Sequence, residues 1–461
     1  KTTLTLAVAS LLSIAPLSMA EEQNNGWDVS NPPGEFKTID ISVNSGTWMN
    51  VDVSPDGEYI VFDLLGVIYR MPFGGGEAEK LIGGIAWHMQ PVYSPDGRYI
   101  AFTSDQGGGD NIWLMDADGS NVRPVTEETF RLLNSPAWSP DGEFLVARKH
   151  FTASRSLGAG EVWMYHRTGG SGVQLTERPN DQKDLGEPAF SPDGKYIYFS
   201  QDDTPGKTFH YSKDSLEGIY KIKRFERETG EIEVLISGAG GAIRPTPSPD
   251  GRYLAYIKRE DFNSVLYVLD LKTGEHKRIY GQMERDMQET WAIHGVYPTM
   301  DWTPDSKQLV FWAGGHIQKL NIDDGNARII PFKVETEKKI QHALRAKQNV
   351  EADTFDVKML RMAQVSPAGD EVIYEALGSL YRRALPDGKP QRLTNSDDFE
   401  LFPEYSRDGE KLVFVRWDDQ EQAQVIVRDL DSGNEQVLNT GKGNFVEPTF
   451  SPDGNHVVYR K

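Results

Sequence analysis

Hydrophobic and polar residues alternate in short runs along this chain, and most of these runs follow a tight-turn sequence. Runs rich in aromatic and β-branched residues, which favour strands, lie at residues 59–62, 99–102, 196–199, 253–256 and 412–414. Second runs of the same kind lie at 111–115, 161–165 and 266–269. The pattern therefore predicts short β-strands joined by turns. The repeats lack the helical period that a leucine-rich or helical solenoid would need.

A Ser-Pro-Asp-Gly sequence, or a degenerate copy of it, occurs nine times. Full copies begin at Ser54, Ser94, Ser139, Ser191, Ser248 and Ser451, and degenerate copies begin at Thr303, Ser366 and Ser406. Proline sets φ at the second position of a type I turn, Asp tolerates the third, and Gly accepts the left-handed conformation that closes a hairpin. Each copy therefore predicts a turn. Ser306 stands in place of the Gly and is expected to be strained by ~1 kcal/mol.

The copies recur at intervals of 40 to 63 residues, which is the period of propeller blades. Each repeat has room for four strands, and one such unit cannot bury both of its faces alone. We therefore expect an all-β fold, a β-propeller of four-stranded antiparallel blades. Because rings commonly hold about four to eight blades, we expect one six- or seven-bladed ring and the start of a second, with one larger ring as the alternative. The aromatic residues before the turns are expected to pack between blades: Trp138, Phe190, Trp302 and Tyr405.

The repeats divide the chain into five parts. Residues 1–20 form a leader and residues 21–46 an N-terminal extension, in which the alternation at 36–43 predicts a strand that could close a ring. Repeats one to six occupy 47–332. The spacing at 335–345 predicts a helix within an insertion or linker at 333–359. Repeats seven to nine occupy 360–461, and the ninth stops after its second strand, which we interpret as the sign of a longer protein.

The leader has the three parts of a secretory signal peptide. Lys1 precedes an apolar run at residues 4–17, a small-x-small site ends at Ala20, and two glutamates follow. A buried first helix is the alternative. We expect an exported protein, periplasmic or secreted, that is cleaved near Ala20.

Composition excludes several functions. The chain of 461 residues carries 49 Lys and Arg against 69 Asp and Glu, a formal net charge of −20. So acidic a surface repels phosphate backbones and anionic headgroups, so we expect no nucleic-acid partner and no membrane insertion. Without a single Cys, the chain holds no disulfide, thiolate zinc ligand or cysteine nucleophile.

Catalytic motifs are missing from the sequence. It contains no G-x-S-x-G nucleophile elbow and no P-loop, and its nine His residues never form H-x-H or H-E-x-x-H. The acidic stretch at 105–110 lacks the regular spacing of a calcium loop and is read as a hairpin loop. We therefore predict no catalytic residue, no metal site and no cofactor in this chain.

Polar residues gather in the segments that precede the first strand of each repeat, where loops should surround a central channel. Side chains that converge there could bind a ligand or partner. The alternative is that they hydrogen-bond neighbouring loops and stiffen the ring. The candidates are His88, Gln90, Arg131, Asn134, His150, Arg155, Asp184, Glu187, Arg244, Arg285, Glu289, Trp291, His294, Tyr297 and Glu447.

The repeated phrase, as in Pro-Ala-Phe-Ser-Pro-Asp-Gly-Lys-Tyr-Ile-Tyr-Phe at 188–199, resembles the TolB-like propeller. Similar blades form the N-terminal propellers of tricorn and prolyl-oligopeptidase-type peptidases. Several stretches outside the repeat resemble the long N-terminal region of large exported bacterial amidohydrolase-family proteins, in which tandem TolB-like propellers precede a metal-dependent barrel. These stretches are 34–51, 180–188, 284–298, 355–361 and 445–461.

The resemblance implies a hydrolase of amide-type C–N bonds whose propellers dock or gate the substrate. The partner of this chain would be its own C-terminal catalytic domain, with a peptide or small amide as substrate. A divalent metal such as zinc is expected only in that missing domain, because the H-x-H ligands have no counterpart here. Two alternatives remain: a stand-alone periplasmic protein-binding propeller resembling TolB, and the propeller of a prolyl-oligopeptidase-type peptidase.

Overall fold

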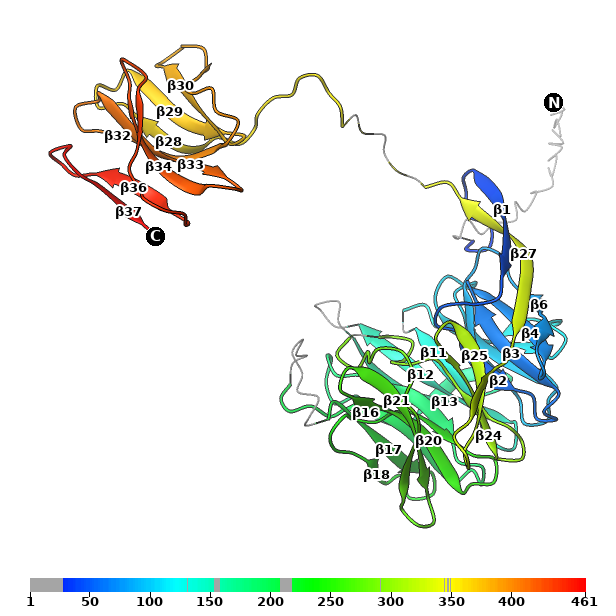
Figure 1. Cartoon of the computed structure of the whole chain (residues 1–461). Coiled ribbons are helices and arrows are strands. Elements are labelled where there is room, and N and C mark those ends of the chain that lie inside the picture. Colours follow the sequence, from blue (N-terminus) through cyan, green and yellow to red (C-terminus); the bar gives the residue numbers. More distant parts are fainter. Residues whose placement is uncertain are drawn as a thin grey trace, which may run out of the picture. The chain divides into compact units, whose positions relative to one another are not determined.

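A computed structural model describes residues 28–130, 132–152, 158–207, 218–290, 292–343, 345, 348 and 350–461 (Figure 1). Throughout these ranges the regular structure is β-strand, and no helix is present. The described residues fall into two compact units, unit 1 ending at residue 344 and unit 2 beginning at Arg345. The prediction of an all-β fold is confirmed.

Unit 1 contains six four-stranded antiparallel sheets, each formed by four strands in sequence order, and these are the blades of a propeller. Blade 1 consists of β2 (Val51–Val53), β3 (Tyr59–Leu64), β4 (Val67–Pro72) and β6 (Glu79–Ile82). Blade 2 consists of β7 (His88–Tyr93), β8 (Tyr99–Ser104), β9 (Asn111–Asp116) and β10 (Arg123–Pro124). Blade 3 consists of β11 (Leu133–Trp138), β12 (Phe144–Thr152), β13 (Gly158–His166) and β14 (Gly169–Gln174). Blade 4 consists of β15 (Leu185–Phe190), β16 (Tyr196–Asp202), β17 (Tyr220–Glu226) and β18 (Ile232–Ile236). Blade 5 consists of β19 (Ile243–Pro247), β20 (Tyr253–Glu260), β21 (Asn263–Asp270) and β22 (His276–Tyr280). Blade 6 consists of β23 (Asp301–Trp302), β24 (Gln308–Ala313), β25 (His316–Asn321) and β26 (Ala327–Ile329).

The six blades close into a ring, because blade 6 bonds directly to blade 1. The N–H of Val51 donates to Thr299 Oγ1 at 3.1 Å, and the N–H of Val53 donates to Asp301 Oδ2 at 3.0 Å. Of the ring sizes that the repeat count left open, the structure has six blades.

The Ser-Pro-Asp-Gly sequences form the predicted turns. In the first copy, Asp56 Oδ1 accepts from the N–H of Glu58 at 3.0 Å, the N–H of Tyr59 donates to Ser54 Oγ at 2.9 Å, and Gly57 has a φ of 72°. Ser306 takes the same left-handed conformation, with a φ of 59°, as its position in the repeat predicts. Its hydroxyl accepts from the N–H of Asp250 in the neighbouring blade, at 3.1 Å, which partly offsets the strain.

Aromatic residues before the turns join neighbouring blades, as predicted. The indole N–H of Trp138 donates to the carbonyl of Val92 at 3.2 Å, and that of Trp302 donates to the carbonyl of Thr246 at 2.9 Å. Each bond leads from one innermost strand to the innermost strand of the preceding blade. Phe190 is buried in an apolar cluster that includes Val146 of blade 3. These contacts and the apolar clusters between blades hold the ring together.

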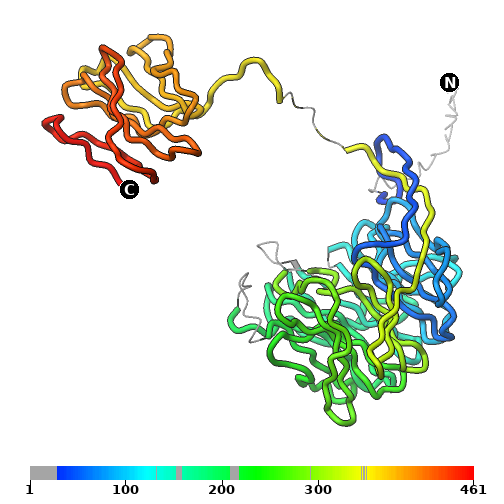
Figure 2. Tube along the Cα trace, in the orientation of Figure 1, coloured from blue at the N-terminus to red at the C-terminus, as the bar shows by residue number. Residues whose placement is uncertain are grey.

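Two expectations about the flanking segments are wrong. The spacing at 335–345 predicted a helix, but Phe332–Gln341 is strand β27, which pairs in antiparallel register with β1 (Phe36–Val43). Here the tertiary partner overrides the local period, since β1 offers β27 a complete ladder. Strand β1 likewise completes no blade. It belongs to a separate sheet of order β1-β27-β5, with β5 at Gly76–Glu77 (Figures 1 and 2).

Unit 2 contains two further four-stranded blades and a two-stranded sheet. Its strands are β28 (Arg361–Val365), β29 (Glu371–Ala376), β30 (Ser379–Ala384), β31 (Gln391–Arg392), β32 (Phe399–Tyr405), β33 (Lys411–Asp418), β34 (Gln422–Asp429), β35 (Glu435–Val437), β36 (Val446–Phe450) and β37 (Val457–Arg460). Tyr405 bridges the two blades through a hydroxyl that donates to Glu371 Oε1 at 2.9 Å.

Candidate functional site

The innermost strands of unit 1 share an irregularity beside the central channel. In β7, β11, β15 and β19 the pairing with the next strand shifts at a β-bulge. One residue of each bulge has a φ of 55° or 56°, a backbone conformation that residues other than Gly rarely adopt. These residues are Gln90, Ser135, Glu187 and Arg244. All four are almost fully buried, and the last three line the channel.

Glu187 joins several neighbouring elements through its carboxylate. Its carboxylate accepts from the Ser200 hydroxyl at 2.6 Å, from the N–H of Arg244 at 2.7 Å and from the N–H of Val296 at 2.8 Å. The Arg244 guanidinium lies 3.3 Å from the same carboxylate. Glu187 therefore ties blade 4 to blade 5 and to the segment before blade 6.

Gln90 plays the same part in blades 2 and 3. Its side-chain oxygen accepts from the N–H of Ser135 at 2.8 Å, and its side-chain N–H donates to the carbonyl of His294 at 2.7 Å. Its own N–H donates to Asp63 of blade 1 at 2.8 Å. Side chains thus pair the backbone groups that the bulges leave free on the innermost strands.

Residues 292–298 close one end of the channel. His294 bonds through Nε2 to Asp110 of blade 2 at 2.8 Å, Val296 donates to Glu187 of blade 4, and the carbonyl of Tyr297 accepts from Arg244 of blade 5. Blades 2 and 5 stand opposite each other in a ring of six. A segment bonded to both must therefore cross the channel.

Four further candidates are buried in the walls of blades 2 to 4. Burial lowers the pKa of His88 to about 4, and its Nδ1 lies 2.9 Å from Ser104 Oγ. Burial and the nearby Arg148 guanidinium lower the pKa of His150 to about 4. Asp184 accepts from Arg148 Nε at 3.0 Å, although burial still raises its pKa. Asn134 is fully buried beside them on β11.

Arg285 and Glu289 take no part in the contacts described above, and Glu447 belongs to unit 2. Arg285 is exposed, Glu289 accepts from Arg259 at 2.6 Å, and Glu447 in unit 2 lies 3.2 Å from Arg460. Tyr297 packs between Trp48 and Trp312, with ring centroids 5.7 and 6.0 Å away. Arg131, Arg155 and Trp291 lie outside the described residues.

The structure therefore brings together Gln90, Glu187, Arg244, His294 and Tyr297 from the predicted set. Their polar groups bond mainly to one another and to neighbouring backbone, which is the arrangement of residues that stiffen a ring. Ligand binding by them stays a prediction.

The channel leads from this closed end to the face that carries the Ser-Pro-Asp-Gly turns. It has a volume of about 400 Å³ and is lined at the turn face by prolines of four repeats, Pro55, Pro95, Pro249 and Pro304. The turn prolines thus stand around a well that is open at one end and closed at the other.

Three carboxyl groups line this well. Glu187 is paired with Arg244, and the other two are Asp52 of β2 and Asp301 of β23. Each bonds to the next blade: Asp52 accepts from the N–H of Tyr93 at 2.7 Å, and Asp301 accepts from the N–H of Val53 at 3.0 Å. The two side chains also interact with each other through a hydrogen bond. Burial raises the pKa of Asp301 to about 6, and burial together with the Asp301 charge raises the pKa of Asp52 well above its usual value.

The sequence prediction missed this pair. Both residues stand two positions before the first residue of the turn phrase, where the other repeats of the ring have small or apolar residues: Val92, Ala137, Ala189 and Thr246. Comparison of the repeats at this position would have singled out the two acids.

Across the described ranges, no group of three or more His, Asp or Glu side chains is placed to hold a metal ion. The described part of the chain also holds no helix with the length and apolarity needed to span a bilayer.

Comparison with known proteins agrees with the blade architecture. Residues 37–210 match the family model of the TolB β-propeller domain. The uncharacterized protein Atu1656 of Agrobacterium fabrum is 24% identical over 274 residues, which cover 56% of this chain and 82% of that protein. The uncharacterized peptidase YuxL of Bacillus subtilis is 27% identical over 156 residues, 26% of this chain and 24% of the peptidase.

Among solved structures, TolB from Acinetobacter baumannii is similar with a TM-score of 0.46 and 16% identity, covering 63% of this chain and 65% of that one. A likeness at this level concerns the fold alone. The family match, the turn phrase and the four-stranded blades agree with one another. The chain is thus a β-propeller protein in which residues 37–210 match the TolB propeller family.

Proposed function

We propose that the ring of unit 1 is the non-catalytic docking and gating part of an exported amidohydrolase-family hydrolase, whose catalytic domain acts on amide-type C–N bonds. The observation that carries the docking role is the well itself. It is closed by residues 292–298, open among the turn prolines, and holds the carboxyl pair Asp52 and Asp301 in its wall. A well of this size can take one end of a ligand and cannot pass it through the ring.

The chemistry of the wall favours a cationic end. Two carboxyl groups that share a proton can exchange it for an ammonium or guanidinium group, since a fixed positive charge between them relieves their repulsion. Prolines and buried aromatic residues such as Trp138 supply apolar surface around them. We therefore infer a peptide or small amide that carries a basic group.

The amidohydrolase assignment rests on the resemblance of the stretches at 34–51, 180–188 and 284–298, and export rests on the leader at 1–20. The similarity to the peptidase YuxL favours a second candidate, the propeller of a serine peptidase. Hydrolysis separates the two. The full gene product should hydrolyse dipeptide amides in a reaction that chelators abolish, whereas a serine-directed inhibitor would abolish it in the second case. Hydrolysis by residues 1–461 alone would overturn the non-catalytic role.

Docking is tested by equilibrium binding of lysine amide, with norleucine amide as a probe of similar length and no side-chain charge. Lysine amide should bind the wild-type chain more tightly, by roughly 10-fold or more. The Asp301→Asn variant should lose this preference. Equal binding of the two amides, or an unchanged preference in the variant, would contradict docking at the carboxyl pair.

A further inference from the structure

Strand β27 has an unpaired edge in the sheet that it forms with β1 and β5. The N–H of His342 donates to the carbonyl of Glu35 at 2.8 Å, which fixes the even-numbered residues of β27 as those bonded to β1. The odd-numbered residues present their backbone groups to the other side. There, β5 pairs only with Phe332 and Lys333.

Among the described residues, nothing pairs with the edge from residue 335 to 341. Within the described ranges, no backbone or side-chain group accepts from the N–H groups of residues 335, 337, 339 and 341. A row of unpaired N–H and C=O groups of this length is a template for another strand.

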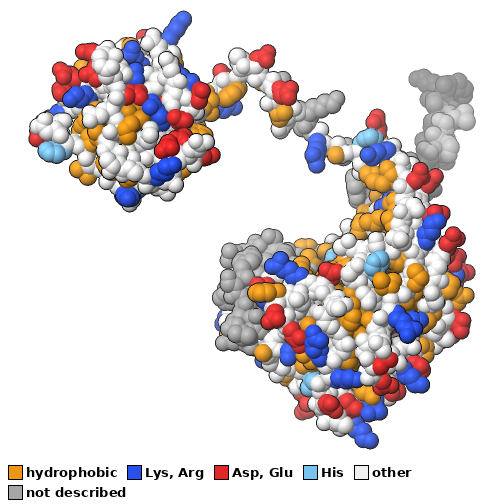
Figure 3. All heavy atoms as spheres, viewed as in Figure 1, with side chains coloured by type: hydrophobic (Ala, Val, Ile, Leu, Met, Phe, Trp, Pro, Cys, Tyr) orange, Lys and Arg blue, Asp and Glu red, His pale blue; other side chains and the backbone are white. Residues whose placement is uncertain are grey.

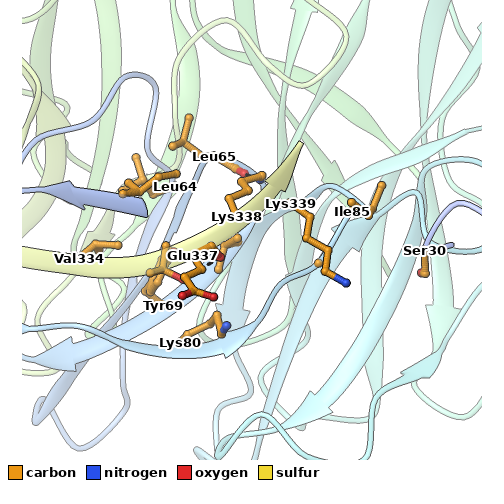
Figure 4. A pocket seen from close by; sticks show the side chains of 14 residues that line it. Ser30, Leu64, Leu65, Tyr69, Lys80, Ile85, Val334, Glu337, Lys338 and Lys339 are labelled. Carbon is orange, nitrogen blue, oxygen red and sulfur yellow. Dashed lines mark hydrogen bonds between the residues drawn. The ribbon is translucent and has the colours of Figure 1, made fainter. Parts of the chain in front are cut away.

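A groove of about 290 Å³ runs beside this edge (Figure 4). Leu64, Tyr69 and Val334 gather at one end of it, and Ile85 and Ser30 lie toward the other. Leu65 also lines the groove and is 47% exposed. Hydrophobic side chains are visible on the surface where the β1–β27 ribbon leaves the blades (Figure 3). Edge strands are often protected by lysines alone, but an apolar groove beneath the edge adds the side-chain sites that a bound strand needs.

Charge indicates the kind of strand that fits. Lys80, Lys338 and Lys339 line the groove against a single acid, Glu337. Lys338 is engaged by the carbonyl of Leu65 and by the ring of Trp87, 5.2 Å away. In the described part of the chain, Lys80 and Lys339 form no ion pair, whereas the nearby Lys333 pairs with Glu335 at 2.5 Å. Two free cations remain for carboxylates of an incoming strand.

We propose that a partner protein binds here by adding an extended segment of alternating apolar and acidic residues to the free edge of β27. Its backbone would pair with the odd-numbered residues from 335 to 341, its apolar side chains would enter the groove, and its carboxylates would meet Lys80 and Lys339. The site is separate from the central channel.

The probe is the peptide acetyl-Thr-Ile-Asp-Val-Glu-Val-Thr-amide, added to the whole chain and followed by fluorescence anisotropy of an attached dye. Three peptides of matched length serve as comparisons: one with Lys in place of Asp and Glu, one with Ser in place of Ile and Val, and one N-methylated at alternate residues. We expect saturable binding of the parent peptide. N-methylation should weaken it at least about 10-fold, because two or more backbone hydrogen bonds are lost.

Two variants locate the site. Lys339→Glu should weaken the acidic peptide by about 5-fold and strengthen the lysine peptide, since exposed ion pairs contribute little more than that. Glu337→Pro removes one edge N–H and leaves the β1 ladder intact, because that N–H points away from β1. It should weaken the acidic peptide by roughly 2- to 10-fold. The thermal midpoint of each variant shows that the ring is still folded.

Several results would overturn the proposal. They are no binding of the parent peptide at millimolar concentration, equal binding of the N-methylated peptide, and equal binding of the lysine peptide. If the chain instead dimerises through this edge, so that Glu337→Pro makes it monomeric and the peptide never competes, the occupant is a second copy and the partner assignment is wrong.

Discussion

Replacement of Glu187 by Ala should destabilise the ring strongly, because this carboxylate connects three parts of it. The substitution removes the acceptor for Ser200 Oγ, for the N–H of Arg244 and for the N–H of Val296. It also leaves the Arg244 guanidinium, whose side chain is 6% exposed, without its carboxylate. Breaking a buried ion pair costs about 3–5 kcal/mol, and each unpaired buried donor costs about 1–3 kcal/mol when counted alone.

These terms overlap, since the same atoms are counted in both. We therefore expect the free energy of unfolding to fall by about 4 kcal/mol in Glu187→Ala. Glu187→Gln keeps one acceptor oxygen but turns an NH2 group toward the remaining donors, so a loss of about 2–3 kcal/mol is expected. Urea unfolding of the whole chain, followed by tryptophan fluorescence, measures both.

Glu447→Ala is the matched control. Glu447 occupies the same position before Pro in the ninth repeat, but it is exposed and pairs with Arg460 at the surface of unit 2. Its replacement should cost less than about 0.5 kcal/mol. If Glu187→Ala also cost less than about 1 kcal/mol, Glu187 would not hold residues 292–298 across the channel as described.

Three further changes test other parts of the structure. The pKa of Asp301 is raised from 3.8 to about 6, so ionisation of Asp301 costs the folded state stability as pH rises through about 6. Relative to wild type, the free energy of unfolding of Asp301→Asn should rise by up to about 3 kcal/mol between pH 4 and 8. A pH dependence parallel to that of wild type would contradict this. The pKa of His88 is lowered from 6.5 to about 4, so the stability that its neutral ring supports is lost as pH falls through this range. In His88→Asn, the loss of unfolding free energy between neutral and acid pH should be smaller by about 3 kcal/mol. An unchanged loss would show that His88 is accessible to protons when folded. Asp141→Ala removes the acceptor for the Ser139 hydroxyl and for the N–H of Glu143, so it should lower the free energy of unfolding by about 1 kcal/mol. An unchanged thermal midpoint would mean that the turn phrase does not need its Asp.

The local pattern predicted the blades well because each strand and turn is defined within a few residues. The turn phrase fixes its own geometry, including the left-handed Ser306, and the aromatic residues before it have only neighbouring blades to pack against. The spacing of the phrase did not fix the number of blades in the ring, because closure depends on long-range bonds such as that between Val53 and Asp301.

Long-range pairing also explains what was mispredicted or missed. Residues 335–345 have a helical spacing of apolar positions, yet β1, some three hundred residues earlier in the chain, supplies a better partner for residues 332–341. Polar residues before the innermost strands were predicted to face a ligand. Many of them instead satisfy backbone groups that the bulges leave free, as Gln90 does for Ser135. The carboxyl pair was missed because Asp52 and Asp301 meet only when the last blade closes on the first.

In our proposal, the carboxyl pair of Asp52 and Asp301 exchanges a proton for a cationic group of the ligand. Calorimetry of lysine amide binding at pH 7, in two buffers with different heats of ionisation, counts the protons released. The raised pKa values of Asp52 and Asp301 predict release of a proton, up to about one per molecule bound, by the wild-type chain and a smaller release by Asp301→Asn. Binding of lysine amide without proton release, or with the same release in the variant, would contradict the claim.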